Sequence, residues 1–468
     1  MPHPDVLSAL RTWGRQPAAE LRTRLNVSRP TLMRAVRAAG DEIIVRGSAR
    51  RTAYAARRAL RGSMAPIALY RIDEQGSAHE QGMVSLAYPD GSALELQESI
   101  EWPLVGNEMV DGWYDGLPYQ LLDMRPQGFL GRRFARANAA ILQVDEDPQK
   151  WSDDDAVYAL SLLGSDTPGN FILGAAAYRR WLESLQMPRP GIRDDDVGAR
   201  YAELAERSLQ HGVAGSSAAG EFPKFTAIRQ HSNAAGQLDD DVSHVIVKFS
   251  GNDESAAVRR WSDLLVCEHL ATRVMRDQLG VPAAETTLHR AAGRTFLEVV
   301  RFDRHGRHGR SGLLSLHALN AAFLGANPAD WPATIARLDA LELLAPTAPE
   351  TVSLMWHFGS LIANVDMHEG NLSFIPSAVG EAGLRVAPAY DMLPMSYVPQ
   401  RGVEMVARNY APQLPLPSER RAWRAAAEAA QAFWSLAADD ERISEGFRAI
   451  CSQNLATLRA LAAHPAAG

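Results

Sequence analysis

The sequence predicts an α+β protein in which a small N-terminal domain precedes a body of two lobes, the first rich in strands and the second helical. The 468 residues, 46% of them hydrophobic, suffice for a small and a large hydrophobic core. Positive charge is concentrated before residue 62, and strand-like alternation begins at residue 67. We therefore expect domains at residues 1–62, 63–300 and 301–468.

Cysteine content and hydropathy exclude several classes of protein. Cys267 and Cys451 lie far apart and outside any CxxC or Cys/His spacing, so neither a disulfide framework nor a structural zinc site is expected. No stretch approaches the about 18 apolar residues that a membrane helix needs. We expect a cytoplasmic protein without a membrane partner.

The N-terminal end is strongly basic. Residues 1–62 hold thirteen arginines and no lysine against four acidic residues, a net charge of +9, which leaves −16 for the remainder of the −7 total. Clustered cations are what neutralisation of a phosphate backbone requires, so this end is expected to bind nucleic acid. A solvated basic arm is the alternative.

The pattern within these residues is typical of a helix-turn-helix. Residues 6–13 and 18–25 form two short amphipathic helices, and Ser28 caps a third that runs to about residue 39. Strands on either side of a basic turn, at residues 42–45 and 52–54, predict a winged variant. A helical protein-docking domain with incidental arginines is the alternative. The side chains of the third helix that are expected to contact DNA are Arg29, Thr31, Arg34 and Arg37.

The middle of the chain carries no chemical motif of its own. Residues 67–98 predict antiparallel strands, and residues 118–185 are mainly helical. Aspartate triplets at residues 153–155, 194–196 and 239–241 resemble metal sites only superficially. Each lies in a polar stretch at an expected helix start or turn, which predicts solvated or capping carboxylates.

A buried lysine and a helical glutamate give the first indication of catalysis. The strand at residues 244–249 carries Lys248, and burial of this ammonium is costly unless an anion meets it. Glu268 lies on the inward face of a long helix expected at residues 256–279. The two match the ion pair with which kinases hold the ATP phosphates. A surface lysine and a helix-edge glutamate are the alternative.

The strongest signal is the loop at residues 364–371, between an apolar helix and a strand. Asp366 and Asn371 have the D-x-x-x-x-N spacing of a kinase catalytic loop, in which the aspartate accepts a hydrogen bond from the incoming hydroxyl. The asparagine offers an oxygen to Mg²⁺, and a hairpin returns Asp391 to its neighbourhood as a second Mg²⁺ ligand. We expect His368 to orient Asp366; metal ligation and a plain loop imidazole are the alternatives.

Four motifs occur in order along the chain. Residues 217–224 have the pattern S-x-x-G-x-x-P-K, residues 301–304 are R-F-D-R, residues 364–371 are N-x-D-x-H-x-x-N, and residues 388–391 are P-x-Y-D. The first, taken alone, is as compatible with a linker as with a phosphate-binding loop. Together, these motifs resemble those of the HipA-type kinases, the toxin half of type II toxin–antitoxin pairs. The resemblance covers roughly residues 65–460.

This resemblance implies a two-lobed protein-kinase-like fold and a serine/threonine protein kinase that uses ATP and Mg²⁺. Lys248, paired with Glu268, would hold the phosphates, Asp366 would be the catalytic aspartate, and Asn371 and Asp391 would bind Mg²⁺. The residues that would contact ATP besides Lys248 are Val299, Val300, Phe302, Ser217 and Gly220. In this family the loop serine is autophosphorylated as an off-switch, which implies Ser217, or the adjacent Ser216, here.

The fused helix-turn-helix is similar to the YjjJ-like branch, because ordinary family members borrow this domain from a separate antitoxin. Expected partners are a DNA operator, bound through residues 1–62, and a protein substrate whose modification arrests growth. Family targets include aminoacyl-tRNA synthetases. Whether a separate antitoxin binds stays open, and a two-fold operator would require a homodimer. The alternative functions are a DNA-binding transcription regulator whose kinase-like body only senses nucleotide, and a small-molecule kinase.

Overall fold

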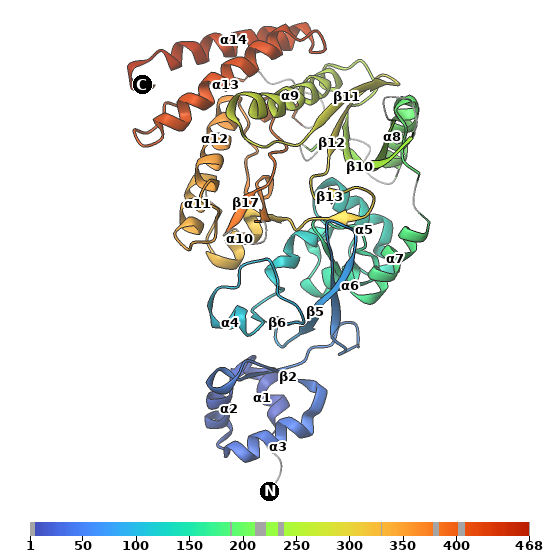
Figure 1. Ribbon diagram of the computed structural model, residues 1–468, viewed down its shortest axis with the longest axis vertical. Helices are drawn as coiled ribbons and strands as arrows, with labels where there is room; N and C mark the ends of the chain where they lie inside the picture. Colours follow the sequence, from blue (N-terminus) through green and yellow to red (C-terminus); the bar gives the residue numbers. More distant parts are fainter. Residues whose placement is uncertain are drawn as a thin grey trace. The chain divides into compact units, whose positions relative to one another are not determined.

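The computed structural model describes residues 5–187, 190–210, 221–232, 238–328, 330–377, 383–400 and 408–467. The chain forms two compact units, whose elements are labelled in Figure 1. The first contains residues 1–73, 77–125 and 140–187, and the second contains residues 74–76, 126–139 and 188–468. Among the described residues, no helix is both long and apolar enough to cross a membrane.

The N-terminal segment (residues 5–62) begins the first unit with three helices whose bounds match those expected: α1 (Val6–Trp13), α2 (Ala18–Leu25) and α3 (Arg29–Ala39). Ser28 caps α3 by accepting a hydrogen bond from the Thr31 amide. The strands are β1 (Gln16–Pro17), β2 (Ile43–Arg46) and β3 (Ala53–Ala56), and β3 pairs antiparallel with both others.

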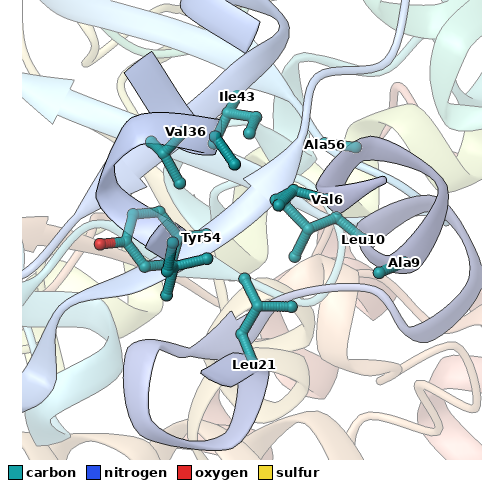
Figure 2. Close-up of a cluster of buried hydrophobic side chains, with 10 residues drawn as sticks. Val6, Ala9, Leu10, Leu21, Val36, Ile43, Tyr54 and Ala56 are labelled. Atoms are coloured by element: carbon teal, nitrogen blue, oxygen red, sulfur yellow. The ribbon is translucent and has the colours of Figure 1, made fainter. Parts of the chain in front are cut away.

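One apolar cluster holds the helices of this segment against its strands, as Figure 2 shows. All three helices contribute side chains to this cluster. Those of α1 and α3 recur every three or four residues, the spacing of one helix face. Its buried members are Val6, Ala9, Leu10, Leu21, Leu32, Ala35, Val36, Ile43, Tyr54 and Ala56.

The middle segment (residues 63–187) contributes a five-stranded antiparallel sheet in the order β7-β6-β5-β4-β8. These strands are β4 (Ile67–Ile72), β5 (Ala78–Leu86), β6 (Ser92–Leu96), β7 (Trp113–Tyr114) and β8 (Phe171–Leu173). Its helices are α4 (Gly106–Val110), α5 (Gly128–Leu142), α6 (Asp153–Leu163) and α7 (Ala175–Gln186), and the boundary between the units falls within α5.

The first two aspartate triplets have structural roles. Asp155 completes a capping box with Ser152 at the start of α6, and Asp194 forms an ion pair with Arg229. Among the described residues, no group of three or more His, Cys, Asp or Glu side chains is arranged to hold a metal ion. The third triplet differs from expectation, because residues 239–241 belong to strand β10 and not to a turn or helix start.

In the second unit, a four-stranded antiparallel sheet has the order β11-β12-β10-β9. Its strands are β9 (Lys224–Ser232), β10 (Leu238–Phe249), β11 (Thr286–Ala291) and β12 (Arg294–Val300). Helix α8 (Val197–Gln210) covers one face, where its Tyr201 packs with Val247 and Phe249 of β10. Successive side chains of a strand point to opposite faces, so Lys248 points to the other face. There Glu268 of helix α9 (Ala256–Leu279) meets it.

The rest of the second unit is mainly helical. Helix α13 packs on α9, α12 and α14, and α12 packs on α11. These helices are α10 (Leu316–Phe323), α11 (Trp331–Asp339), α12 (Ala348–Leu361), α13 (Arg420–Asp439) and α14 (Glu445–Ala462). The short strands are β13 (Arg304–His305), β14 (Gly309–Arg310), β15 (Leu314–Ser315), β16 (Ser373–Pro376) and β17 (Leu384–Val386), and β16 and β17 form the expected hairpin before Asp391.

Candidate active site

Three residues from distant parts of the second unit meet at Lys248. The Lys248 ammonium donates hydrogen bonds to both carboxylate oxygens of Glu268, at 2.6 Å and 2.8 Å. It also donates to Oδ1 of Asp391. Lys248 is 4% exposed and Glu268 is 1% exposed. The pair predicted between strand and helix is therefore present, and Asp391 joins it.

The electrostatics of this cluster favour a charged lysine. Burial opposes the charge, but the carboxylates of Asp391 and Glu268 outweigh it and raise the pKa of Lys248. Burial likewise acts against a charged Asp391, but the Lys248 ammonium holds the pKa of Asp391 below its usual value. The cluster thus keeps a cation and an anion side by side in a nearly buried site.

Two backbone hydrogen bonds join the segment before Asp391 to the chain that follows α9. Ala284 N donates to Ala389 O at 2.9 Å, and Ala389 N donates to Pro282 O at 2.8 Å. Asn364 Nδ2 donates to the backbone oxygen of Asp391 at 3.4 Å. Asp391 itself adopts a positive φ of 54°, a conformation uncommon for a residue with a side chain. Backbone contacts to both sides thus determine where its carboxylate lies.

The loop at residues 364–371 is ordered by its own side chains. Asn364 Oδ1 accepts the Asp366 amide at 3.0 Å, and Asn371 Nδ2 donates to the Asp366 carbonyl at 2.8 Å. Burial raises the pKa of the Asp366 carboxyl, with nearby Asp391 acting in the same direction and His368 opposing it. His368 uses Nδ1 to accept the Gly370 amide at 3.0 Å.

Glu369, which the sequence does not single out, anchors this loop. It is 4% exposed, and its carboxylate accepts hydrogen bonds from Asn320 Nδ2 at 2.8 Å and 3.0 Å and from Thr334 Oγ1 at 3.1 Å. These partners lie on α10 and α11. A glutamate in a polar loop gives no signal of burial, so only the tertiary structure reveals this role.

Lys224 and Glu221 are a second pair that the sequence leaves without a role. Lys224 Nζ lies 2.9 Å from Glu221 Oε1, and its charge lowers the pKa of Asp391. Glu221 also accepts the Phe129 amide at 2.9 Å and Arg132 Nη2 at 2.7 Å. Gly128 permits this contact, because a Cβ there would lie 3.0 Å from Glu221 Oε1. Lys224 therefore adds positive charge near the carboxylates of Asp366 and Asp391.

In the R-F-D-R segment after β12, two arginines donate hydrogen bonds to the aspartate between them. Asp303 accepts from Arg301 Nε at 3.0 Å and Nη2 at 2.9 Å, and from Arg304 Nη1 at 2.7 Å. Val299 is buried within β12, and the Val300 amide is bonded to Glu285 O at 2.9 Å.

Phe302, at the same connection, lies beside the P-x-Y-D motif, its ring centroid 6.0 Å from that of Tyr390. The Tyr390 hydroxyl donates to Gly370 O at 3.0 Å. Phe302, one of the residues expected to contact ATP, is thus linked through Tyr390 to the loop at residues 364–371. Ser216, Ser217 and Gly220 lie outside the described residues.

The donor set suits Mg²⁺. Carboxylate and amide oxygens are the ligands this ion prefers, and it is usually bound by one or two such side chains together with substrate phosphates. Asp391 supplies a carboxylate kept charged by Lys248, with a third of its side chain exposed. Asn371, held by its amide nitrogen, would supply an oxygen. The residues therefore fit the ion without forming a complete protein cage.

The residues expected to bind DNA lie in the first unit. Arg29, Arg34 and Arg37 are exposed on α3. Thr31 is partly buried, and its hydroxyl lies 2.9 Å from that of Ser28.

Comparison with known proteins gives concordant results. The chain is 37% identical over 448 residues to Toxin YjjJ of Escherichia coli strain K12, a match covering 96% of each chain. Residues 63–182 match the family described as YjjJ-like toxin, middle domain, and residues 216–458 match the HipA-like C-terminal domain.

Two solved structures share 15% sequence identity with the chain. A chain of the Shewanella oneidensis MR-1 complex of HipA, HipB and operator DNA matches with a TM-score of 0.48, covering 84% of this chain and 96% of that one. The Helicobacter pylori proinflammatory kinase CtkA matches with a TM-score of 0.33, covering 47% of this chain and 87% of that one. On its sequence identity to Toxin YjjJ and its two family matches, this chain belongs to the YjjJ-like toxins of the HipA family.

Proposed function

We propose that this protein is an ATP-dependent serine/threonine protein kinase that arrests growth by phosphorylating a cellular protein. The observation that carries the proposal is the position of Lys248, which contacts both Glu268 and Asp391. A buried ammonium between a helix glutamate and the aspartate of a metal-binding motif suits the triphosphate of ATP. ATP is available in the cytoplasm, which is where we propose that the protein acts.

The remaining residues of the site have roles in phosphoryl transfer. Lys248 would hold the α- and β-phosphates, and Glu268 would orient it. Asp366 would accept a hydrogen bond from the substrate hydroxyl, a task for which a raised pKa is suited. Asn371 and Asp391 would hold Mg²⁺, which supplies charge neutralisation at the γ-phosphate. Catalysis would then rest on positioning and electrostatics.

The serine loop would regulate the kinase. Phosphorylation of Ser217, or of Ser216, is proposed to switch the enzyme off. Double substitution of both serines by alanine should prolong growth arrest on expression. Unchanged arrest, together with an unmodified loop in wild-type protein by mass spectrometry, would contradict this proposal.

The N-terminal segment is proposed to bind DNA as a winged helix-turn-helix. Its α3 carries three exposed arginines, and its α2 carries Arg22 and Arg24, also exposed. Such a surface suits a phosphate backbone and predicts binding that weakens as salt rises. The bound operator would serve autoregulation, with an antitoxin and a second copy of the chain as candidate partners.

A transcription regulator that only senses nucleotide is the competing function. It would not need a catalytic aspartate, whereas this chain has Asp366 together with Lys248, Asn371 and Asp391. An enzyme acting on small molecules would not need a fused basic segment.

A phosphoproteome comparison tests the proposal and identifies the target. Cells would express either wild-type protein or Asp366→Asn, matched in abundance, and phosphopeptides would be compared before growth stops. The proposal predicts one or a few serine or threonine sites present only with wild type, an aminoacyl-tRNA synthetase being one candidate. Growth arrest by both forms with no differing site would contradict it.

A further inference from the structure

The middle segment covers the strand side of the N-terminal segment. The chain leaving β3 bonds directly to the chain leaving β5: Arg58 N donates to Leu86 O at 2.8 Å, and Tyr88 N donates to Ala56 O at 3.0 Å. These bonds flank an isolated antiparallel bridge between Arg57 and Ala87. The two segments are therefore docked, not joined by a free linker.

An apolar cluster lies beneath these bonds. It contains side chains of β2 and β3 together with side chains of the middle-segment sheet. Separation of the two segments would expose them to water. Its buried members are Ile44, Ala53 and Ala55 from the N-terminal segment and Ala87, Ala93 and Trp113 from the middle segment.

The turn between β2 and β3, residues 47–52, would be the wing of a winged helix. Two arginines, Arg46 just before this turn and Arg51 within it, are held by the middle segment. Arg46 Nη1 lies 3.3 Å from Glu95 Oε1, and Arg51 Nη2 lies 3.0 Å from Asp111 Oδ1. Arg51 Nη1 also donates to Asn107 Oδ1 at 2.8 Å. The Asp111 side chain is 10% exposed, so it depends on this cation for its charge compensation.

The same arrangement extends along the contact. Arg15 Nη2 lies 2.7 Å from Glu108 Oε1, and Arg61 Nη2 lies 2.6 Å from Asp155 Oδ1. With Arg46, Arg51 and Arg58, which pairs with Asp154, five of the thirteen arginines of this segment face middle-segment carboxylates. Among the described residues of the N-terminal segment, the exposed arginines for which no ion pair is found are Arg22 and Arg24 on α2, Arg29, Arg34 and Arg37 on α3, and Arg50 in the turn.

We infer that the middle segment clasps the wing through Arg46 and Arg51, which keeps these two arginines off DNA, and that the arginines of α2 and α3 make the main contacts with DNA. This inference rests on the proposed DNA binding and adds its footprint. For Arg46 or Arg51 to reach a phosphate, each would have to leave its carboxylate, and departure of Arg51 would leave Asp111 without its cation in a nearly buried position. The arginines of α2 and α3 meet no such obstacle.

The test is the salt dependence of DNA binding by the full chain. Fluorescence anisotropy of a fluorescein-labelled mixed-sequence duplex gives the binding constant at several salt concentrations. The slope of log K against log salt loses about 0.9 for each phosphate contact removed. Arg34→Gln and Arg37→Gln should each lower the slope by about this amount.

Substitutions at the clasp should behave differently. Arg51→Gln should leave the slope unchanged and the affinity within about twofold of wild type, because Arg51 does not contact DNA. Asp111→Asn should not weaken binding, because it removes only the carboxylate that holds Arg51. Arg51→Lys is the control, because it keeps a positive charge beside Asp111 and so keeps the N-terminal segment held against the middle segment. Hydrogen exchange of the β2 and β3 amides confirms that each variant remains docked.

The outcomes distinguish failure of the inferred footprint from failure of the proposed DNA binding. A lower slope for Arg51→Gln, restored by Arg51→Lys, would place the wing on DNA and overturn the inference. Tighter binding by Asp111→Asn, abolished when Arg51→Gln is added, would support it, because Arg51 would then contact DNA only after its carboxylate partner is removed. If the wild type binds no duplex, the proposed DNA-binding function fails, and the inferred footprint fails with it. The same conclusion follows if the binding constant does not change with salt or with substitution of Arg34 and Arg37.

Discussion

Lys248 and Asp391 lie 143 residues apart in the chain, yet the Lys248 ammonium donates a hydrogen bond to the Asp391 carboxylate. This contact joins the four-stranded sheet to the segment that follows the β16–β17 hairpin. It brings the proposed phosphate-binding cation next to the proposed Mg²⁺ ligand. Several measurable properties of the protein depend on it.

Removal of Lys248 should destabilise the fold. Lys248→Ala leaves Glu268 fully buried without its cation, and loss of one partner of a buried pair costs about 3 kcal/mol. Urea unfolding measures this free energy. Arg421→Ala is the matched control, because Arg421 pairs with Glu350 at 3.1 Å on an exposed surface and such pairs contribute about 1 kcal/mol or less. Equal losses for the two variants would contradict the predicted difference.

Loss of the Glu369 anchor should impair the catalytic loop. Glu369→Ala removes the acceptor of the Thr334 hydroxyl and leaves the Asn320 amide only its longer bond to Ala326 O, at a cost of about 2 kcal/mol in stability. Phosphoryl transfer should fall at least about tenfold, because a loop shifted by 1 Å loses its alignment. Glu428→Ala, on the exposed side of α13, should change stability by about 0.5 kcal/mol or less. An unaltered rate in Glu369→Ala would show that the loop keeps its shape without this anchor.

Asp391→Asn should separate nucleotide binding from metal dependence. The amide keeps the size of the side chain but loses the charge that favours Mg²⁺. The Mg²⁺ concentration needed for half-maximal binding of a fluorescent ATP analogue should rise at least about tenfold, a difference of about 1.4 kcal/mol. Binding measured in EDTA should change much less. An unshifted Mg²⁺ titration would exclude Asp391 as a ligand.

Stability should fall in mild acid through His269. Burial, with Arg442 and other arginines nearby, lowers the pKa of His269 to about 4, and its Nδ1 lies 2.9 Å from Thr286 Oγ1. An unfolded histidine has a pKa of about 6.5. Between these values the unfolded chain binds more protons than the folded chain, so stability decreases as pH falls through this window.

Urea unfolding at pH 7 and pH 4.5 measures the effect. The part due to His269 is at most about 2 kcal/mol, allowing for its partial exposure. His269→Gln should lose less stability between the two pH values than wild type by that amount. Identical losses in the two proteins would show that His269 does not titrate in this range.

Local features of the fold could be predicted from the sequence because they depend on neighbouring residues. The bounds of α1, α2 and α9 follow from apolar periodicity and capping residues, and Ser28 caps α3 as expected. The Lys248–Glu268 pair could be predicted because a buried lysine requires an anion and a helix of suitable phase follows the strand.

Tertiary contacts could not be predicted in this way. The burial of Glu369 depends on Asn320 and Thr334, which precede it by 49 and 35 residues. The charge of residues 1–62 could be counted, but the count does not show that Arg46 and Arg51 are already paired. Which cations are available depends on a docked surface that no local pattern describes.

Incubation of the purified protein with γ-labelled ATP and Mg²⁺, alone and with a cell lysate, tests the kinase assignment most directly. Protein verified as unphosphorylated at the start would be compared with Asp366→Asn, which should bind ATP normally. The account predicts label on serine or threonine of wild type or of a lysate protein, and none with Asp366→Asn. No label with either form, or equal label with both, would contradict it.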